Sequence, residues 1–143
     1  MTRLNLKTWI AVLAAIAVMA LGLIVWRFTA PVEVRIEADV TNLPFEVEII
    51  PPVVYAKPGE MVRVVYRIRN TNLSPLDALG RVEVDPNSAT DQIQIFITQC
   101  IGLNAFQSNY PQDFEVLFRV QPAGLTGQGT IILRHVFESA TLR

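Results

Sequence analysis

The sequence predicts an all-β fold, an immunoglobulin-like β-sandwich that is preceded by a single N-terminal transmembrane helix. Two observations support this fold class. Residues 9–26 carry no charge and, apart from Gly22, are all apolar. Beyond residue 30, apolar and polar residues alternate in several short runs, and residues that favour turns separate these runs. Alternation with a period of two is typical of half-buried strands, and many short strands at regular spacing are typical of a sandwich.

The N-terminal apolar segment is long enough to cross a bilayer. A helix rises about 1.5 Å per residue, so residues 9–26 would span about 27 Å, close to the roughly 30 Å of a hydrocarbon core. Trp9 and Trp26 lie at the two ends of the segment, where indole rings favour the headgroup layer. We therefore predict a transmembrane helix here.

A cleaved signal peptide is the alternative interpretation of this segment. Its apolar stretch is longer than that of most signal peptides, and the nearest cleavage candidate, after Ala30, has the bulky Phe28 before it and Pro31 after it. We expect an uncleaved anchor, with residues 1–30 forming a short arm and the helix and residues 31–143 forming the exported β-sandwich.

The charges on either side of the helix predict its orientation. Arg3 and Lys7 precede the helix, whereas all 13 acidic residues follow it. The positive-inside rule then places the N-terminus in the cytoplasm, or in the matrix of an organelle. We expect a single-pass inner-membrane protein whose C-terminal domain lies in the periplasm or the intermembrane space.

The strand-like runs of the exported part follow one another with short turns between them. In the first run, Val34, Ile36 and Ala38 alternate with charged residues. The runs lie, in order, at residues 32–40, 45–49, 53–56, 61–69, 79–84, 92–99, 113–121 and 129–137. Turn-forming segments lie at residues 57–60, 70–75, 85–87 and 122–127. We predict seven or eight antiparallel strands in two sheets, held together by packing alone.

Composition and charge exclude several classes of function. The 12 basic and 13 acidic residues give a net charge of −1, which provides no basic surface for nucleic acid. One Cys excludes a disulfide within the chain, and one His leaves too few ligands for a zinc finger or a His-rich metal site. His135 lies inside a strand-like run, which favours a structural role. We expect neither an enzyme nor a partner of nucleic acid.

Two further features bear on binding. Arg63, Arg67 and Arg69 share one face of a predicted strand. Such a face could bind an acidic partner, but we favour a solvated sheet face, which is the more common explanation. Cys100 follows the run at 92–99, at a strand end or in the next loop. A free Cys is most often a small buried hydrophobe. In an oxidising exported compartment, the alternatives are a thiol that binds a metal or pairs with another chain.

Several short motifs follow one another along the exported part of the chain. They lie at residues 34–39 (Val-Arg-Ile-Glu-Ala-Asp), 43–45 (Leu-Pro-Phe), 57–60 (Lys-Pro-Gly-Glu), 66–70 (Tyr-Arg-Ile-Arg-Asn), 84–86 (Val-Asp-Pro), 100 (Cys) and 131–137 (Ile-Ile-Leu-Arg-His-Val-Phe). In their order and spacing, the motifs resemble those of the CtaG family of cytochrome c oxidase assembly proteins. The resemblance covers roughly residues 9–137, the apolar segment included.

The resemblance implies a function in copper delivery. Members of the family have a single anchor and an exported immunoglobulin-like domain, and they insert copper into the CuB centre of haem-copper oxidases. It implies Cys100 as a metal ligand, Cu(I) as the cofactor, and as partner the subunit of cytochrome c oxidase that carries copper and haem. The family motif is Cys-Phe-Cys-Phe, and here Cys100 keeps the first position while Gly102 occupies the second.

One thiol per chain leads to two hypotheses. Copper(I) favours two or three thiolate ligands, so two chains in a homodimer could supply two Cys100 sulfurs to a linear site. Alternatively, the chain is an accessory or structural subunit without copper, bound stably to cytochrome c oxidase or to another respiratory membrane complex. In both, the few residues between the helix and Pro31 keep the β-domain close to the membrane, which favours a membrane-embedded partner.

Overall fold

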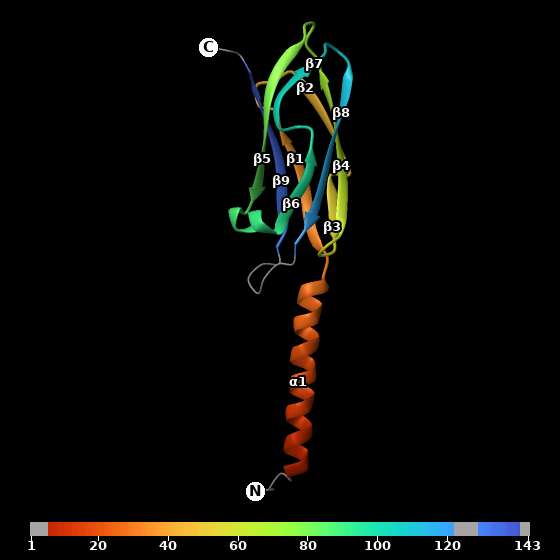
Figure 1. The fold of residues 1–143 in the computed structure, drawn as a ribbon, viewed down its shortest axis with the longest axis vertical. Helices are drawn as coiled ribbons and strands as arrows, with labels where there is room; N and C mark the ends of the chain where they lie inside the picture. The colour runs from red at the N-terminus through yellow and green to blue at the C-terminus, as the bar shows by residue number, and fades with distance from the viewer. Residues whose placement is uncertain (1–5, 122–128, 141–143) are drawn as a thin grey trace.

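The computed structural model describes residues 6–121 and 129–140. A long helix, α1 (Leu6–Thr29), projects from one end of a β-domain (Figure 1). Within α1, the segment Lys7–Trp26 is long and apolar enough to cross a membrane, and none of it is buried against the rest of the chain. The apolar surface of this helix is thus available to lipid.

The described part of the chain after α1 contains nine strands in two sheets and one short 3-10 helix, η1 (Asn87–Gln92). The strands are β1 (Val32–Asp39), β2 (Phe45–Ile50), β3 (Val53–Ala56), β4 (Met61–Asn70), β5 (Leu76–Asp85), β6 (Ile93–Thr98), β7 (Gly102–Phe106), β8 (Pro111–Val120) and β9 (Ile131–Ser139). One sheet has five strands in the order β3-β1-β9-β5-β7, and the other has four in the order β2-β4-β8-β6.

The two sheets share one apolar core. Along β4, buried and exposed side chains alternate as the sequence predicts, with Val64, Tyr66 and Ile68 fully buried. Phe106 of β7 lies at the centre of an aromatic cluster, since its ring centroid is 4.5 Å from that of Phe45 and 5.4 Å from that of Phe114. Phe45 and Phe114 belong to the four-stranded sheet, so this cluster joins the two layers.

The structure corrects two features of the predicted strand pattern. The described residues form nine strands rather than seven or eight, because β7 was not predicted. This strand begins at Gly102, and Leu103 points outward with 67% of its surface exposed, so β7 lacks the usual apolar-inward alternation. In addition, β1 and β9 pair in parallel, not antiparallel. The predicted turn at 122–127 lies outside the described residues.

Candidate functional site

Cys100, the candidate metal ligand, lies in the turn that carries the chain from β6 in one sheet to β7 in the other. Its side chain is fully buried and its thiol is free. The side-chain Nδ2 of Asn104 donates a hydrogen bond to the backbone oxygen of Cys100 at 3.3 Å. On the other side, that oxygen faces Gly80 so closely that a Cβ on Gly80 would lie 1.8 Å from it. The turn is therefore packed on both sides.

Burial also sets the chemistry of this thiol. Desolvation raises the pKa of Cys100 from 9.0 to about 12, so the thiol form is strongly favoured. Copper binds the thiolate form of Cys. Within residues 6–121 and 129–140, no group of three or more His, Cys, Asp or Glu side chains is arranged to hold a metal ion. A linear site between two Cys100 sulfurs would require the turn between β6 and β7 to open first.

His135 lies in the core and forms a polar pair with Tyr66. The Tyr66 hydroxyl lies 2.7 Å from Nδ1 of His135 and 3.3 Å from the backbone oxygen of Glu37, while Nε2 of His135 lies 3.4 Å from the hydroxyl of Thr98. Burial lowers the pKa of His135 to about 4, and burial together with the nearby Cys100 raises that of Tyr66. Both side chains are neutral at pH 7 and hydrogen bonded, as expected of a structural pair.

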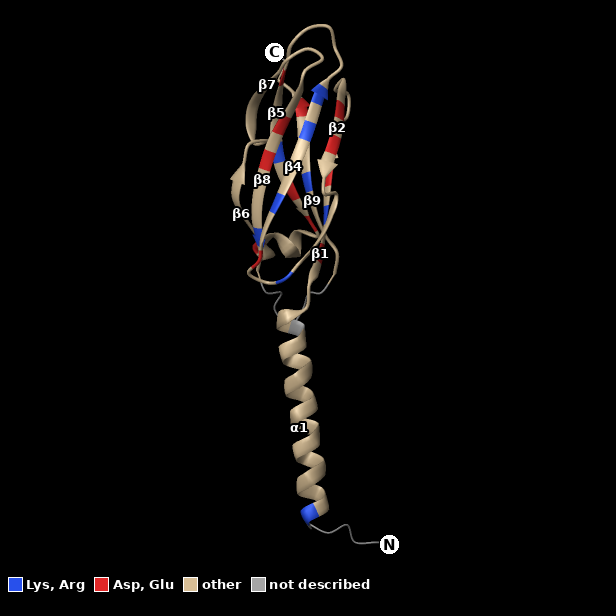
Figure 2. Ribbon diagram, turned by 90° about the vertical axis from the view of Figure 1, so that its right-hand side faces the viewer, with Lys and Arg blue, Asp and Glu red and all other residues tan. Residues whose placement is uncertain are grey.

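The arginine face of β4 is neutralised by acidic residues of the neighbouring strands. Figure 2 shows the basic positions of β4 between acidic positions of β2 and β8. The ion pairs are Arg63–Glu115, Arg67–Asp113, Arg67–Glu48 and Arg69–Glu46. This outer face agrees with the predicted solvated sheet face and presents little net charge to an acidic partner.

The connection between α1 and β1 is short. The backbone N–H of Ala30 donates to the oxygen of Trp26 at 2.8 Å, and β1 begins at Val32. Trp26 and Tyr55 of β3 line a cavity of about 380 Å³ at this junction. Because residues from the end of α1 and from β1 and β3 line this cavity together, the base of the β-domain lies beside the end of the helix.

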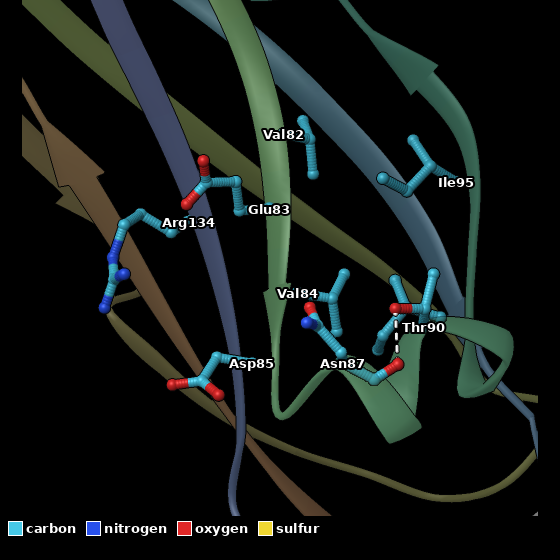
Figure 3. Close-up of a pocket in the computed structure, with 9 residues that line it drawn as sticks. Val82, Glu83, Val84, Asp85, Asn87, Thr90, Ile95 and Arg134 are labelled. Carbon is cyan, nitrogen blue, oxygen red and sulfur yellow. Dashed lines mark hydrogen bonds between the residues drawn. The ribbon is translucent and has the colours of Figure 1, made fainter.

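A larger groove lies at the same end of the domain, where β5, η1 and β6 meet. Its volume is about 710 Å³. Figure 3 shows Val82, Val84 and Ile95 on one side of β5, and Glu83 on the other side. No local pattern in the sequence marks this groove. The groove lies beside the part of β5 that β7 does not cover, and the strand β7 was not predicted.

Comparison of the sequence with models of known protein families and with curated proteins found no match.

Proposed function

We propose that this chain is a membrane-anchored assembly factor of the haem-copper cytochrome c oxidase, and that it acts by docking on the membrane subunit that carries copper and haem. The observation that carries the proposal is the short connection from Trp26 to Val32, which keeps the β-domain next to the bilayer. A domain held in this way meets partners that are themselves embedded in the membrane. The ordered motifs that resemble the CtaG family supply the oxidase as that partner.

An immunoglobulin-like β-sandwich in the exported compartment is part of this proposal. Two sheets of five and four strands around one core support the sandwich. Arg3 and Lys7 before the uncharged segment 9–26 support an N-terminus in the cytoplasm or matrix, and a C-terminal domain in the periplasm or intermembrane space. Leu73 is 90% exposed, so a Leu73→Cys variant reports the side on which the domain lies. A membrane-impermeant maleimide should label it from the exported side, and labelling only after the inner membrane is opened to the cytoplasm would reverse the orientation.

Copper carriage through Cys100 is the second candidate function. Its support is the position of Cys100 at the first Cys of the family motif. Against it stand the burial of the thiol and the geometry of Gly102, whose φ of 88° strains any other residue at the second motif position. We therefore place docking first and copper carriage by Cys100, alone or in a homodimer, second.

The test compares strains that carry the full chain, no chain, or the Cys100→Ser variant. We expect deletion to lower the amount of assembled oxidase, and Cys100→Ser to restore it, because docking does not need the thiol. If deletion leaves the oxidase content and activity unchanged, the assembly role is wrong. If Cys100→Ser fails to restore the oxidase although it folds, and the wild-type chain binds Cu(I) stoichiometrically, copper carriage replaces docking.

Co-purification separates the assembly factor from the accessory subunit. An assembly factor should be enriched with oxidase that lacks copper and should be released from the mature enzyme. A constant ratio of this chain to mature oxidase, or to another respiratory complex, would favour a stably bound subunit without copper.

A further inference from the structure

The strand β5 is paired along only part of one edge. On one side, β9 pairs with β5 from Ala78 to Asp85. On the other side, β7 pairs only as far as Gly80, and no strand in the described part of the chain pairs with residues 81–85 there. Along such an edge, alternate residues direct their N–H and C=O groups away from the sheet. Residues 81–85, the open edge of β5, therefore present main-chain groups that another strand could bind.

The path of the chain explains why the edge is open. β7 begins at Gly102, opposite Gly80, and the preceding residues cross to β6 in the other sheet. Gly102 adopts a φ of 88° at this crossing, a conformation that favours glycine. Between this crossing and the end of the domain that carries α1, β5 and β6 belong to different sheets and do not pair. The groove of about 710 Å³ lies between them.

The groove has an apolar floor along the open edge. Val82, Val84 and Ile95 are partly buried against the core, and Ile93 is buried. The groove also includes Glu83 and Asp85 on the outer face of β5, so it wraps around the strand edge (Figure 3). In strand addition, main-chain hydrogen bonds supply affinity and alternate side chains fill pockets. This groove fits an extended segment whose inward side chains are apolar.

The outer face of the open edge carries Arg81, Glu83 and Asp85, a net charge of −1, and Arg134 of β9 lies opposite Glu83. Glu83 accepts a hydrogen bond from Nε of Arg81 at 3.1 Å, and the nearby Arg134 pairs with Glu37 at 2.8 Å. Asp85 makes no ion pair with any residue that the structure describes. Side chains directly opposite one another on neighbouring strands favour opposite charges. A strand added here gains most from basic side chains opposite its acidic neighbours.

The open edge lies at the end of the domain that carries α1. Arg35 pairs with Ile132 and Ile132 pairs with Asp85, so these residues lie at one level of the sheet. Arg35 is about 10 Å from the start of β1 at Val32, given about 3.3 Å per residue. An extramembrane segment of a membrane protein can therefore reach the open edge.

A second copy of this chain does not fit the open edge. β5 runs toward α1 (Figure 1), so antiparallel pairing of two such edges would point the two anchors in opposite directions. Parallel pairing requires a two-fold axis parallel to the strands, and this rotation exchanges the two faces of the sheet. Val82 and Val84 of the second copy would then lie on the face opposite to Val82 and Val84 of the first. Two chains anchored in one bilayer in the same orientation thus cannot join these edges and keep both apolar floors covered.

We propose that residues 81–85 bind an extended segment of a partner protein as an added strand, with apolar side chains in the groove and basic side chains opposite Glu83 and Asp85. This inference adds a docking surface to the function proposed above. It rests on the edge itself, so peptide binding can be shown or refuted whether or not the partner is cytochrome c oxidase.

The test uses the full chain in nanodiscs and three capped peptides of equal length. The first peptide alternates valine with lysine, and the second alternates valine with glutamate. The third is the valine–lysine peptide with proline in place of each valine. We expect the valine–lysine peptide to bind and to slow amide hydrogen exchange at residues 81–85 more than at 76–80. The glutamate peptide should bind at least about tenfold more weakly because its charges repel Glu83 and Asp85. The proline peptide should bind much more weakly because every second residue lacks a main-chain N–H donor and the inward valine side chains are gone.

Charge reversal on the two halves of β5 gives a matched pair of variants. Asp85 and Asp77 are both exposed and lie on the same face of the strand, but Asp77 lies where β7 already occupies the edge. Asp85→Lys should weaken the valine–lysine peptide about tenfold, and Asp77→Lys should leave its affinity unchanged.

Several results would overturn the proposal. They are no binding of the valine–lysine peptide, equal binding of the glutamate or proline peptide, and equal effects of the two charge reversals. The peptide comparisons stand even if Asp85→Lys does not fold. A homodimer in nanodiscs that Asp85→Lys dissociates would assign the open edge to a second copy and also overturn the proposal.

Discussion

At the scale of single residues, burial decides the chemistry of the two side chains that a metal would be expected to use. Cys100 and His135 are both fully buried, and desolvation favours the neutral form of each. His135 has hydrogen-bond partners on both ring nitrogens, in Tyr66 and Thr98. These residues act first as parts of the core, and any chemistry at Cys100 must begin with an opening of the turn that holds it.

We predict that the Cys100 thiol is unreactive in the folded chain. Raising its pKa from 9.0 to about 12 lowers the thiolate fraction at neutral pH about a thousandfold, and burial blocks the reagent as well. Ellman's reagent should modify the chain rapidly in denaturant and very slowly without it. Fast modification of the folded chain would show that the turn opens readily, and would strengthen the copper hypothesis.

Stability should fall in mildly acidic solution because of His135. The ordinary pKa of 6.5 drops to about 4 in the folded chain, so between these values the unfolded state binds more protons. The free energy of unfolding therefore decreases as the pH falls through this window, by on the order of 3 kcal/mol in all. Urea unfolding of the full chain in detergent, at pH values across the window, measures this slope.

The control is His135→Gln, which should be less stable at neutral pH but should lose this slope. Asp39 and Asp113 have lowered pKa values in the folded chain, so their contribution to stability is lost mainly below pH 3.8. It therefore does not overlap with the window of His135. A His135 ring that titrates near its ordinary pKa in NMR spectra would contradict the prediction, even if the variant does not fold.

At the scale of elements, the length of each pairing matters as much as the strand itself. β5 alternates between buried and exposed residues as predicted, yet its two edges differ, because β9 follows it to Asp85 and β7 pairs only as far as Gly80. At Gly80, the chain crosses from the turn of Cys100 into the start of β7, and this close contact holds the turn in place and leaves the groove open. One tight contact thus shapes both candidate sites.

We predict that Gly80→Ala destabilises the chain. Its Cβ would lie 1.8 Å from the backbone oxygen of Cys100, so the turn would have to shift, at a cost of about 1–3 kcal/mol or more. The matched control is Gly129→Ala, whose Cβ would meet no atom within 4 Å. Urea midpoints of the two variants compare the effects, and equal midpoints would mean that the crossing is loosely packed.

At the scale of the whole molecule, the helix and the β-domain form one elongated body with a short connection (Figure 1). The junction places Trp26 and Tyr55 around one cavity, and the open edge of β5 lies at the same end. The end of the domain that is connected to α1 therefore also carries the proposed docking surface.

A flexible linker inserted after Ala30 should weaken the function. About 15 residues of glycine and serine would let the domain move about 20 Å from the end of α1, which lowers its effective concentration at a membrane-embedded partner. We expect less assembled oxidase in a strain with this variant. The same linker after the exposed Leu73 is the control and should have no such effect. Unchanged oxidase content with the linker after Ala30 would argue against docking near the membrane.

The sequence by itself determined the helix and most of the strands. Both leave a local signal, a long uncharged apolar segment in residues 9–26 and a period of two beyond residue 30, because side chains on successive residues of a half-buried strand alternate between core and solvent. The short connection and the arginine face of β4 were also visible in this way. The tertiary structure decided the rest.

Contacts between segments far apart in the chain decide four features. These are the parallel pairing of β1 with β9, the start of β7 opposite Gly80, the burial of Cys100 and the open edge of β5. Such contacts leave no period in the sequence. A local pattern can show which face of a strand is buried, but only the folded sheets show which edge has a partner.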